Sequence, residues 1–102
     1  MESWFVTRHP GAAEWAKRHN FAIDRVVSHL DIEKIKPGDR VMGTLPVNIA
    51  AEICRKGAAF YHLSMNTAES QRGKEISADD MDAMRVHLER YSVVKIEDGD
   101  EF

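Results

Sequence analysis

A net charge of −3 over 102 residues argues against a protein that binds nucleic acid non-specifically, because such proteins are usually basic. The length suits one domain with one core, and 43% hydrophobic and 30% charged residues are ordinary values for a globular chain. Cys54 is the only cysteine, and there is no signal peptide and no apolar run near the roughly 20 residues of a membrane helix. We therefore expect a soluble cytoplasmic protein with no membrane or duplex nucleic acid partner.

The first half of the chain alternates between strand and helix patterns. Ser3–Thr7 is short, apolar and β-favouring, and Pro10 suits the first turn of the helix that follows. One face of that helix carries Ala12, Trp15, Ala16 and His19. Further strands are predicted at Asp24–Leu30 and Arg40–Thr44, separated by a segment too short for more than one helical turn.

The second half continues this alternation. Pro46–Lys56 predicts a helix that Gly57 closes, and Ala59–Met65 predicts a strand. The polar stretch 66–76 predicts a loop, and Ser77 with Asp80 forms a capping-box pattern before a further helix. We expect that helix to bury the stripe Met81, Met84, Leu88 and Tyr91, with a fifth strand at 91–97 and an acidic tail at 98–102.

Strands that alternate with helices predict one Rossmann-like α/β domain over residues 1–97, with a mostly parallel five-stranded sheet and helices on both faces. The expected strand order is 2-1-3-4-5. This order places a topological switch point between strands 1 and 3, where open sheets of this kind bind ligands at the carboxyl ends of the strands.

Two segments at that point, "VTRHPGA" and "GTLPVNIA", share one construction, in which a strand is followed by a proline at the first helical position. Leu45, before Pro46, has no capping oxygen, so the amides of Val47 and Asn48 are available to an anion. The ordinary alternative is that water or Thr44 satisfies these amides, because every helix has free amides at its start.

The side chains near both segments allow two interpretations each. Arg8 binds an anion or pairs with a surface carboxylate, and His9 transfers protons or is only the residue before the helix. Asn48 reaches a ligand or faces solvent. His62 and Ser64 share one face of a strand, where His62 suits a core or surface role and Ser64, nearer the strand end, lines the pocket or does not.

No metal or cofactor is expected. His9, His19 and His29 lie ten residues apart, a spacing that fits no metal site. The sequence also lacks a nucleophile elbow, a P-loop and the glycine fingerprint G-x-G-x-x-G. An unrelated nucleotide-binding protein of flavodoxin-like topology is therefore disfavoured.

The stretches "WFVTRHPGAAEWAKRH", "DRVVSHLD", "KPGDRVMGTLPVNIAAEICRKGAAFYHLSM" and "RGKEISADDM" resemble a small CRISPR-associated family of type III systems. This is the standalone ring-nuclease family of the Csx group, which is related in fold to CARF domains. The resemblance runs from Trp4 to about Ile96, and "TRHPGA" and "GTLPVNIAAE" are its most specific parts.

The resemblance implies a homodimer that binds cyclic tetra-adenylate and cuts it, without metal, into linear di-adenylate. It does not by itself assign catalytic residues. On chemical grounds we expect Arg8 and His9 to act in catalysis. Ligand contacts are expected from Thr7, Pro10, Thr44, Leu45, Pro46, Val47, Asn48 and Ser64. A dimer that sequesters the ring without cutting it is the alternative.

Overall fold

The structure is a computed structural model that describes residues 1–64 and 77–97. The loop predicted at 66–76, Met65 and the acidic tail predicted at 98–102 lie outside these residues. The elements are β1 (Ser3–Val6), α1 (Pro10–Arg18), β2 (Arg25–Val27), the short 3₁₀ helix η1 (Ile32–Lys34), β3 (Arg40–Gly43), α2 (Val47–Arg55), β4 (Ala59–Ser64), α3 (Ala78–Ala83) and β5 (His87–Tyr91).

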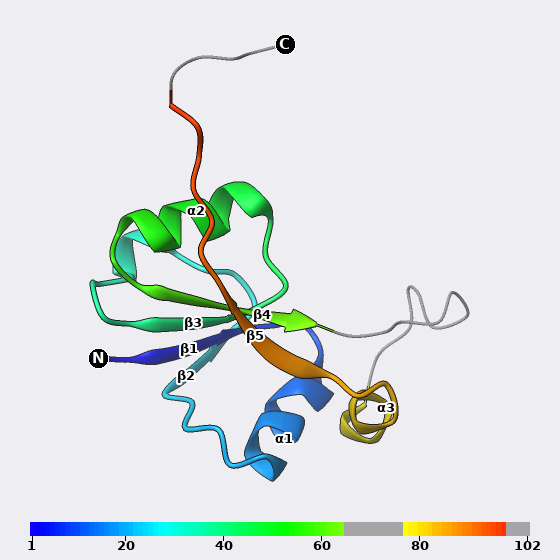
Figure 1. The fold of residues 1–102 in the computed structure, drawn as a ribbon. Coiled ribbons are helices and arrows are strands. Elements are labelled where there is room, and N and C mark those ends of the chain that lie inside the picture. Colours follow the sequence, from blue (N-terminus) through cyan, green and yellow to red (C-terminus); the bar gives the residue numbers. More distant parts are fainter. Residues whose placement is uncertain (65–76, 98–102) are drawn as a thin grey trace.

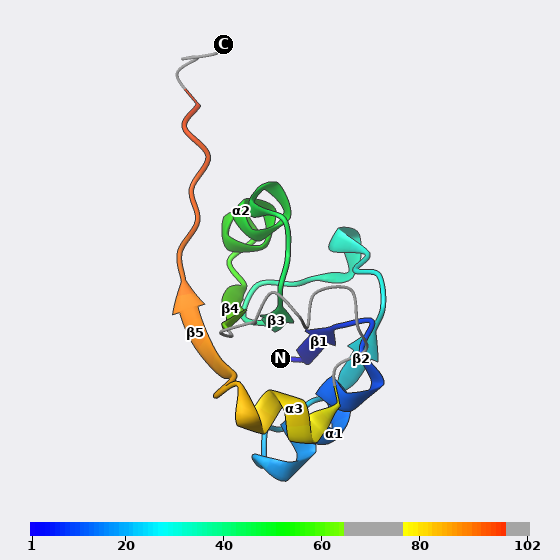
Figure 2. The ribbon, with the colours of Figure 1, turned by 90° about the vertical axis from the view of Figure 1, so that its right-hand side faces the viewer.

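The strands form one sheet in the order β2-β1-β3-β4-β5, which confirms the predicted order (Figure 1). The first four strands in this order run parallel, whereas β5 runs antiparallel to β4. Figure 2 looks onto the end of the sheet where the parallel strands finish. The crossover helices that parallel strands require cover both faces, as expected for an α/β domain.

Each face of the sheet has its own hydrophobic core, because neighbouring residues of a strand point to opposite faces. Phe5 lies in the core beneath α1 and α3, while its neighbour Trp4 lies in the core beneath α2 and η1. Trp15 from α1 and Met81 from α3 are almost fully buried in the core with Phe5. Ile53 from α2 is fully buried in the core with Trp4. Figure 2 shows α2 on one side of the sheet and α1 and α3 on the other.

The last strand does not lie where the sequence pattern places it. The expected strand was 91–97, but β5 spans His87–Tyr91, and α3 ends at Ala83. Leu88 and Tyr91 therefore belong to a strand and not to a buried helical stripe, although Met81 and Met84 are buried as expected. The reason is the partner strand: Ser64 of β4 lies opposite His87 and Phe60 lies opposite Tyr91. Beyond Tyr91 the chain passes the start of β4.

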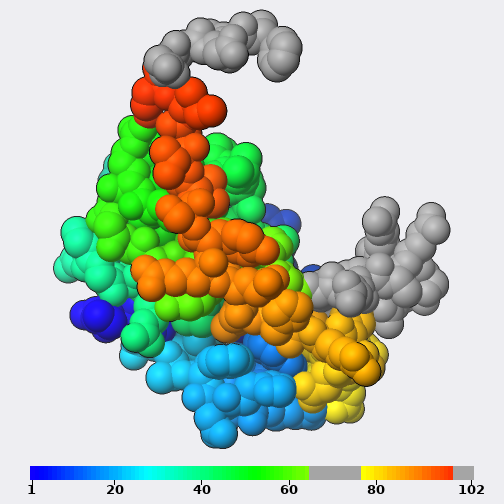
Figure 3. Space-filling view, in the orientation of Figure 1, coloured from blue at the N-terminus to red at the C-terminus, as the bar shows by residue number. Residues whose placement is uncertain are grey.

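Residues 92–97 consequently run along the outside of the molecule beside α2 (Figure 3). Val94 and Ile96 are 79% and 76% exposed, although both residues favour β structure. Val93 packs against the core under α2, and Arg55 of that helix forms an ion pair with Glu97. This segment lies at the opposite end of the strands from the site described below.

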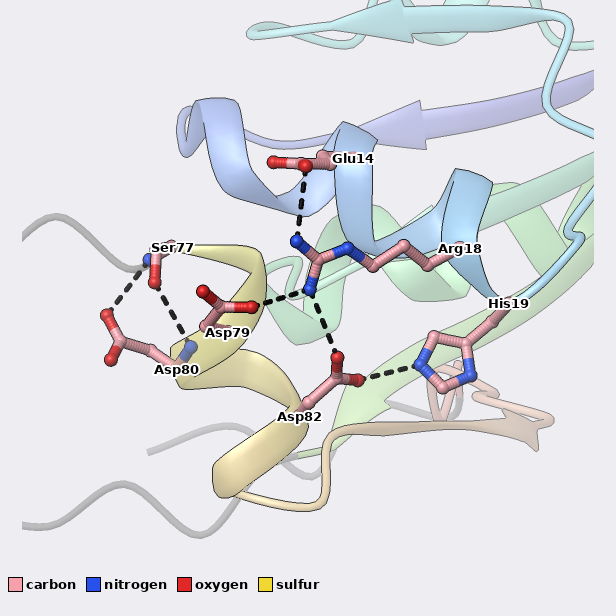
Figure 4. Close-up of polar contacts among 7 residues, drawn as sticks. All are labelled: Glu14, Arg18, His19, Ser77, Asp79, Asp80 and Asp82. Carbon is pink, nitrogen blue, oxygen red and sulfur yellow. Dashed lines mark hydrogen bonds and ion pairs between the residues drawn. The ribbon is translucent and has the colours of Figure 1, made fainter.

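Charged side chains connect α1 to α3 across the surface (Figure 4). Arg18 lies 2.7 Å from Asp79 and 3.4 Å from Asp82, and His19 lies 2.8 Å from Asp82. The predicted capping box at the start of α3 is present, since the side chains of Ser77 and Asp80 each accept the other residue's backbone N–H at 3.1 Å. Local and tertiary contacts together hold this six-residue helix.

Candidate functional site

A cleft of about 590 Å³ opens at the carboxyl ends of the parallel strands. This is the predicted switch point between β1 and β3. Six of the predicted site residues line it: Thr7, Arg8, His9, Thr44, Leu45 and Pro46. Its other lining residues are Val6, Ser28, His29, Leu30, Ile49 and Leu63. The structure therefore joins both proline-containing segments in one cleft.

The β1 side of the cleft is fixed by hydrogen bonds around Thr7. The Thr7 amide donates to the carbonyl of Val27 at 2.9 Å, and the Thr7 hydroxyl oxygen accepts the amide of His9 at 3.1 Å. His9 keeps an extended backbone as the residue before α1, and Pro10 occupies the first helical position as predicted. Pro10 itself does not line the cleft.

Arg8 is exposed between Thr7 and His9. Among residues 1–64 and 77–97, the ion pairs found join other side chains, and Arg8 takes part in none of them. The alternative in which a surface carboxylate holds this guanidinium is therefore not observed in that part of the chain. An exposed guanidinium without a carboxylate partner among the described residues is suited to bind an anion.

The β3 side of the cleft depends on a close approach of two strands. Gly43 has φ +150°, and a Cβ atom there would lie 2.6 Å from the carbonyl oxygen of Val6. Only glycine allows this contact without a shift of the backbone. Thr44 follows, and its hydroxyl donates to the carbonyl of Leu63 at 3.2 Å. Thr44 is thus directed toward β4 and does not cap α2.

Pro46 differs from its predicted position by one residue. It was expected inside the helix, but its ψ of 146° is extended, so α2 begins at Val47 and Pro46 is the N-cap. The proline ring fixes φ and leaves ψ free, which permits this placement. The Pro46 carbonyl accepts the amides of Ile49 and Ala50 at 3.1 and 3.0 Å.

The start of α2 has no side-chain cap. In the part of the chain that the structure describes, no acceptor is found for the amides of Val47 and Asn48. Both residues are exposed, and their side chains do not line the cleft. Their amides nevertheless follow directly after Pro46, which does line it. They therefore provide two donors beside the cleft, at the positive end of the α2 dipole.

Ser64 and His62 lie on β4 and are not among the lining residues of the cleft. The Ser64 hydroxyl, together with the neighbouring His87, holds the pKa of the Glu89 carboxyl below its usual range. The His62 ring packs between aromatic neighbours, with ring centroids 6.2 Å from Phe60 and 5.9 Å from Tyr91. The ordinary packing role expected for His62 agrees with this arrangement.

The sequence pattern missed Ser28, His29 and Leu30 as cleft residues. The predicted strand ran from Asp24 to Leu30, which placed all three within it. The observed β2 ends at Val27, because its partner strand β1 ends opposite it at Val6. The signal was available in the strand order, since a strand next to β1 also finishes at this end of the sheet.

The side chains that line the cleft favour an anionic ligand. Among the described residues they include one guanidinium and two imidazoles, from Arg8, His9 and His29, and no carboxylate. Among the described residues, Arg8 and the two free amides beside it give the cleft a locally positive character in a chain of net charge −3. Their chemistry suits a phosphate group that needs positive donors and groups able to transfer protons.

Within 1–64 and 77–97, no group of three or more His, Cys, Asp and Glu side chains is arranged to hold a metal ion. In the same residues, none of the helices has both the length and the apolar composition needed to span a bilayer.

A protein-family model described as "Putative CRISPR-associated protein (Cas_VVA1548)" matches residues 4–94. The matched range includes the whole sheet except Ser3, the first residue of β1, and it includes all the described lining residues of the cleft. No curated protein and no solved structure matches the chain significantly.

Proposed function

Since the chain belongs to the Cas_VVA1548 family of CRISPR-associated proteins, we propose that it is a ring nuclease of type III CRISPR signalling. The proposed substrate is cyclic tetra-adenylate, and the proposed product is linear di-adenylate with 2′,3′-cyclic phosphate ends. Destroying the ring would switch off the effectors that this messenger activates. The resemblance in the sequence supplies the substrate, and the chemistry of the cleft supports it.

The observation that carries the proposal is the cleft itself. It combines Arg8, two histidines and hydroxyl groups at the carboxyl ends of parallel strands, and its lining within residues 1–64 and 77–97 contains no acidic side chain. The cyclic ligand is made of phosphates, riboses and adenines, so its anionic part matches these donors. Apolar side chains of Leu45, Ile49 and Leu63 add a surface on which a base can pack.

The chemistry needs no nucleophile from the protein. The 2′-hydroxyl of the substrate attacks the neighbouring phosphorus, and the 5′-oxygen leaves on the opposite side. The cleft must hold the ring so that this attack is in line. Arg8 and the amides of Val47 and Asn48 would stabilise the charge on the phosphoryl oxygens, while His9 would transfer a proton. Thr7 and Thr44 would hold ribose or phosphate oxygens.

A homodimer follows from the symmetry of the ligand. A cyclic tetranucleotide has two-fold or four-fold symmetry, and one cleft accommodates only part of it. A two-fold dimer presents two copies of the same strand ends to one ring. We propose that the two clefts face each other across the dimer axis, on the end of the sheet opposite residues 92–97.

A protein that only sequesters the ring would use the same cleft, and the products distinguish the two functions. The test is to incubate the purified protein with cyclic tetra-adenylate in EDTA and to identify the products by mass. Linear di-adenylate with a 2′,3′-cyclic phosphate supports the ring nuclease. Intact ring that stays bound supports sequestration, and a protein that neither binds nor cuts the ring refutes both proposals.

A further inference from the structure

We infer that His29 is a second proton-transfer residue of the cleft and that it shares the acid and base roles with His9. This inference rests on the proposed ring cleavage and adds a residue that the sequence patterns did not assign. Its basis is the position of His29 in the fold, the absence of side-chain hydrogen bonds and ion pairs of His29 within residues 1–64 and 77–97, and the number of protons that the reaction moves.

The fold brings His29 to the cleft through the pairing of β1 with β2. Val6 and Val27 are the last paired residues of these parallel strands, and the amide of Thr7 bonds to the Val27 carbonyl at 2.9 Å. The chain therefore leaves both strands at the same level of the sheet. His29 lies two residues after Val27, and His9 lies three residues after Val6. Both side chains line the same cleft from different segments.

The five histidines of the chain fall into two groups. Outside the cleft, His19 and His87 each contact a carboxylate, at 2.8 and 3.2 Å, and His62 packs against two aromatic rings. Inside the cleft, His9 and His29 form no side-chain hydrogen bond or ion pair with the rest of the described chain. The rings outside have structural partners, and the two inside are free to meet a ligand.

Cleavage of one linkage moves two protons. As the bond from the 2′-oxygen to phosphorus forms, the 2′-hydroxyl proton passes to one imidazole. As the bond from phosphorus to the 5′-oxygen breaks, the other residue, as an imidazolium, donates a proton to the leaving oxygen. In-line attack places these oxygens on opposite sides of the phosphorus, so one ring cannot serve both at once. Two histidines on separate segments meet this requirement.

The test compares His9→Gln, His29→Gln and a control, His19→Gln, which removes a histidine at the far end of α1. Each variant is assayed on two substrates. One is ordinary cyclic tetra-adenylate, and the other carries sulfur in place of the leaving 5′-oxygen. A thiolate leaves without a proton, so this substrate no longer needs a general acid but still needs a general base.

We expect both cleft variants to bind the ordinary ring within a few-fold of the parent and to cut it about 10²- to 10⁴-fold more slowly. The sulfur substrate should restore the rate of one cleft variant, which identifies the acid, and not of the other, which identifies the base. His19→Gln should cut both substrates at the parent rate.

Three results would overturn the inference: a His29→Gln variant that cuts the ordinary ring like the parent, rescue of both cleft variants by sulfur, or rescue of neither. A merely structural role of His29 would weaken binding and cutting together and would not respond to the leaving group. If the parent protein cuts neither substrate, the proposed nuclease function fails, and this inference fails with it. If the parent cuts both, only the role of His29 is at issue.

Discussion

The Nε2 atom of His19 lies 2.8 Å from Oδ1 of Asp82, and this contact connects the end of α1 to α3 (Figure 4). The His19 ring, with Arg18 as a second partner, holds the pKa of the Asp82 carboxyl below its usual range. Because α3 has only six residues, it is too short to be stable alone. We conclude that these side chains help to hold α3 against α1.

Asp82→Asn should therefore lower the melting temperature at pH 7. A carboxyl whose pKa is lower in the folded state stabilises fully above its unfolded value of about 4, and this contribution is lost as the pH falls through the folded pKa. The difference between parent and variant should thus shrink in melts recorded below about pH 4. Asp79→Asn is the control, because the Asp79 side chain is 86% exposed and, among the described residues, pairs with Arg18 alone, so its effect should be smaller. Equal melting temperatures at pH 7 would contradict the role of Asp82.

Gly43→Ala should destabilise the domain by about 2 kcal/mol or more, because its Cβ would press against the backbone of Val6 in a left-handed conformation. Gly38→Ala is the matched control: Gly38 also has positive φ, at 88°, but a Cβ there meets open space. Urea unfolding of both variants measures the difference. Similar losses in the free energy of unfolding for the two variants would show that β1 and β3 can move apart to accommodate the added Cβ atom.

Arg8→Ala should weaken binding of cyclic tetra-adenylate by about 2–4 kcal/mol and slow cutting as well, because it removes a charge-assisted contact to a desolvated phosphate. Titration calorimetry measures the affinity. Arg90→Ala, on the exposed edge strand away from the cleft, is the control for loss of an arginine. Circular dichroism should show an intact fold, and a variant that binds and cuts like the parent would place the anion site elsewhere.

The ring should protect the amides of Val47 and Asn48 from hydrogen exchange. These amides lack an acceptor in the described chain and should exchange quickly without ligand. We expect slower exchange there and from Arg8 to Gly11, beyond any change at the buried Met84, which serves as the internal reference for global stabilisation. Slowing confined to residues 66–74, outside the described part of the chain, would argue that the strand ends do not bind the ring.

Light scattering should give the mass of a homodimer at micromolar concentration, with and without cyclic tetra-adenylate. The expectation follows from a ligand larger than one cleft. A monomer mass under both conditions would contradict a site shared between two chains. It would not contradict the proposal that the cleft of a single chain binds an anion.

The sequence by itself determined the features that depend on residues close together in the chain, such as the order of strands and helices and the capping of a helix. The alternation of strand and helix patterns predicted the sheet order, because parallel strands need crossover helices and right-handed connections. The capping box of Ser77 and Asp80 was readable for the same reason, since both of its hydrogen bonds lie within four residues. The prolines that follow the first and third strands also predicted that Arg8, His9, Thr44 and Pro46 lie together at one end of the sheet.

Only the tertiary structure decided where strands stop and which side chains meet. β5 lies at His87–Tyr91 because these residues face β4 from Ser64 back to Phe60, and β2 stops at Val27 because β1 stops at Val6. A strand ends where its partner's hydrogen-bonding groups end, and that partner is distant in sequence. The same long-range pairing brought His29 into the cleft, directed Thr44 to Leu63 and left Ser64 beside Glu89.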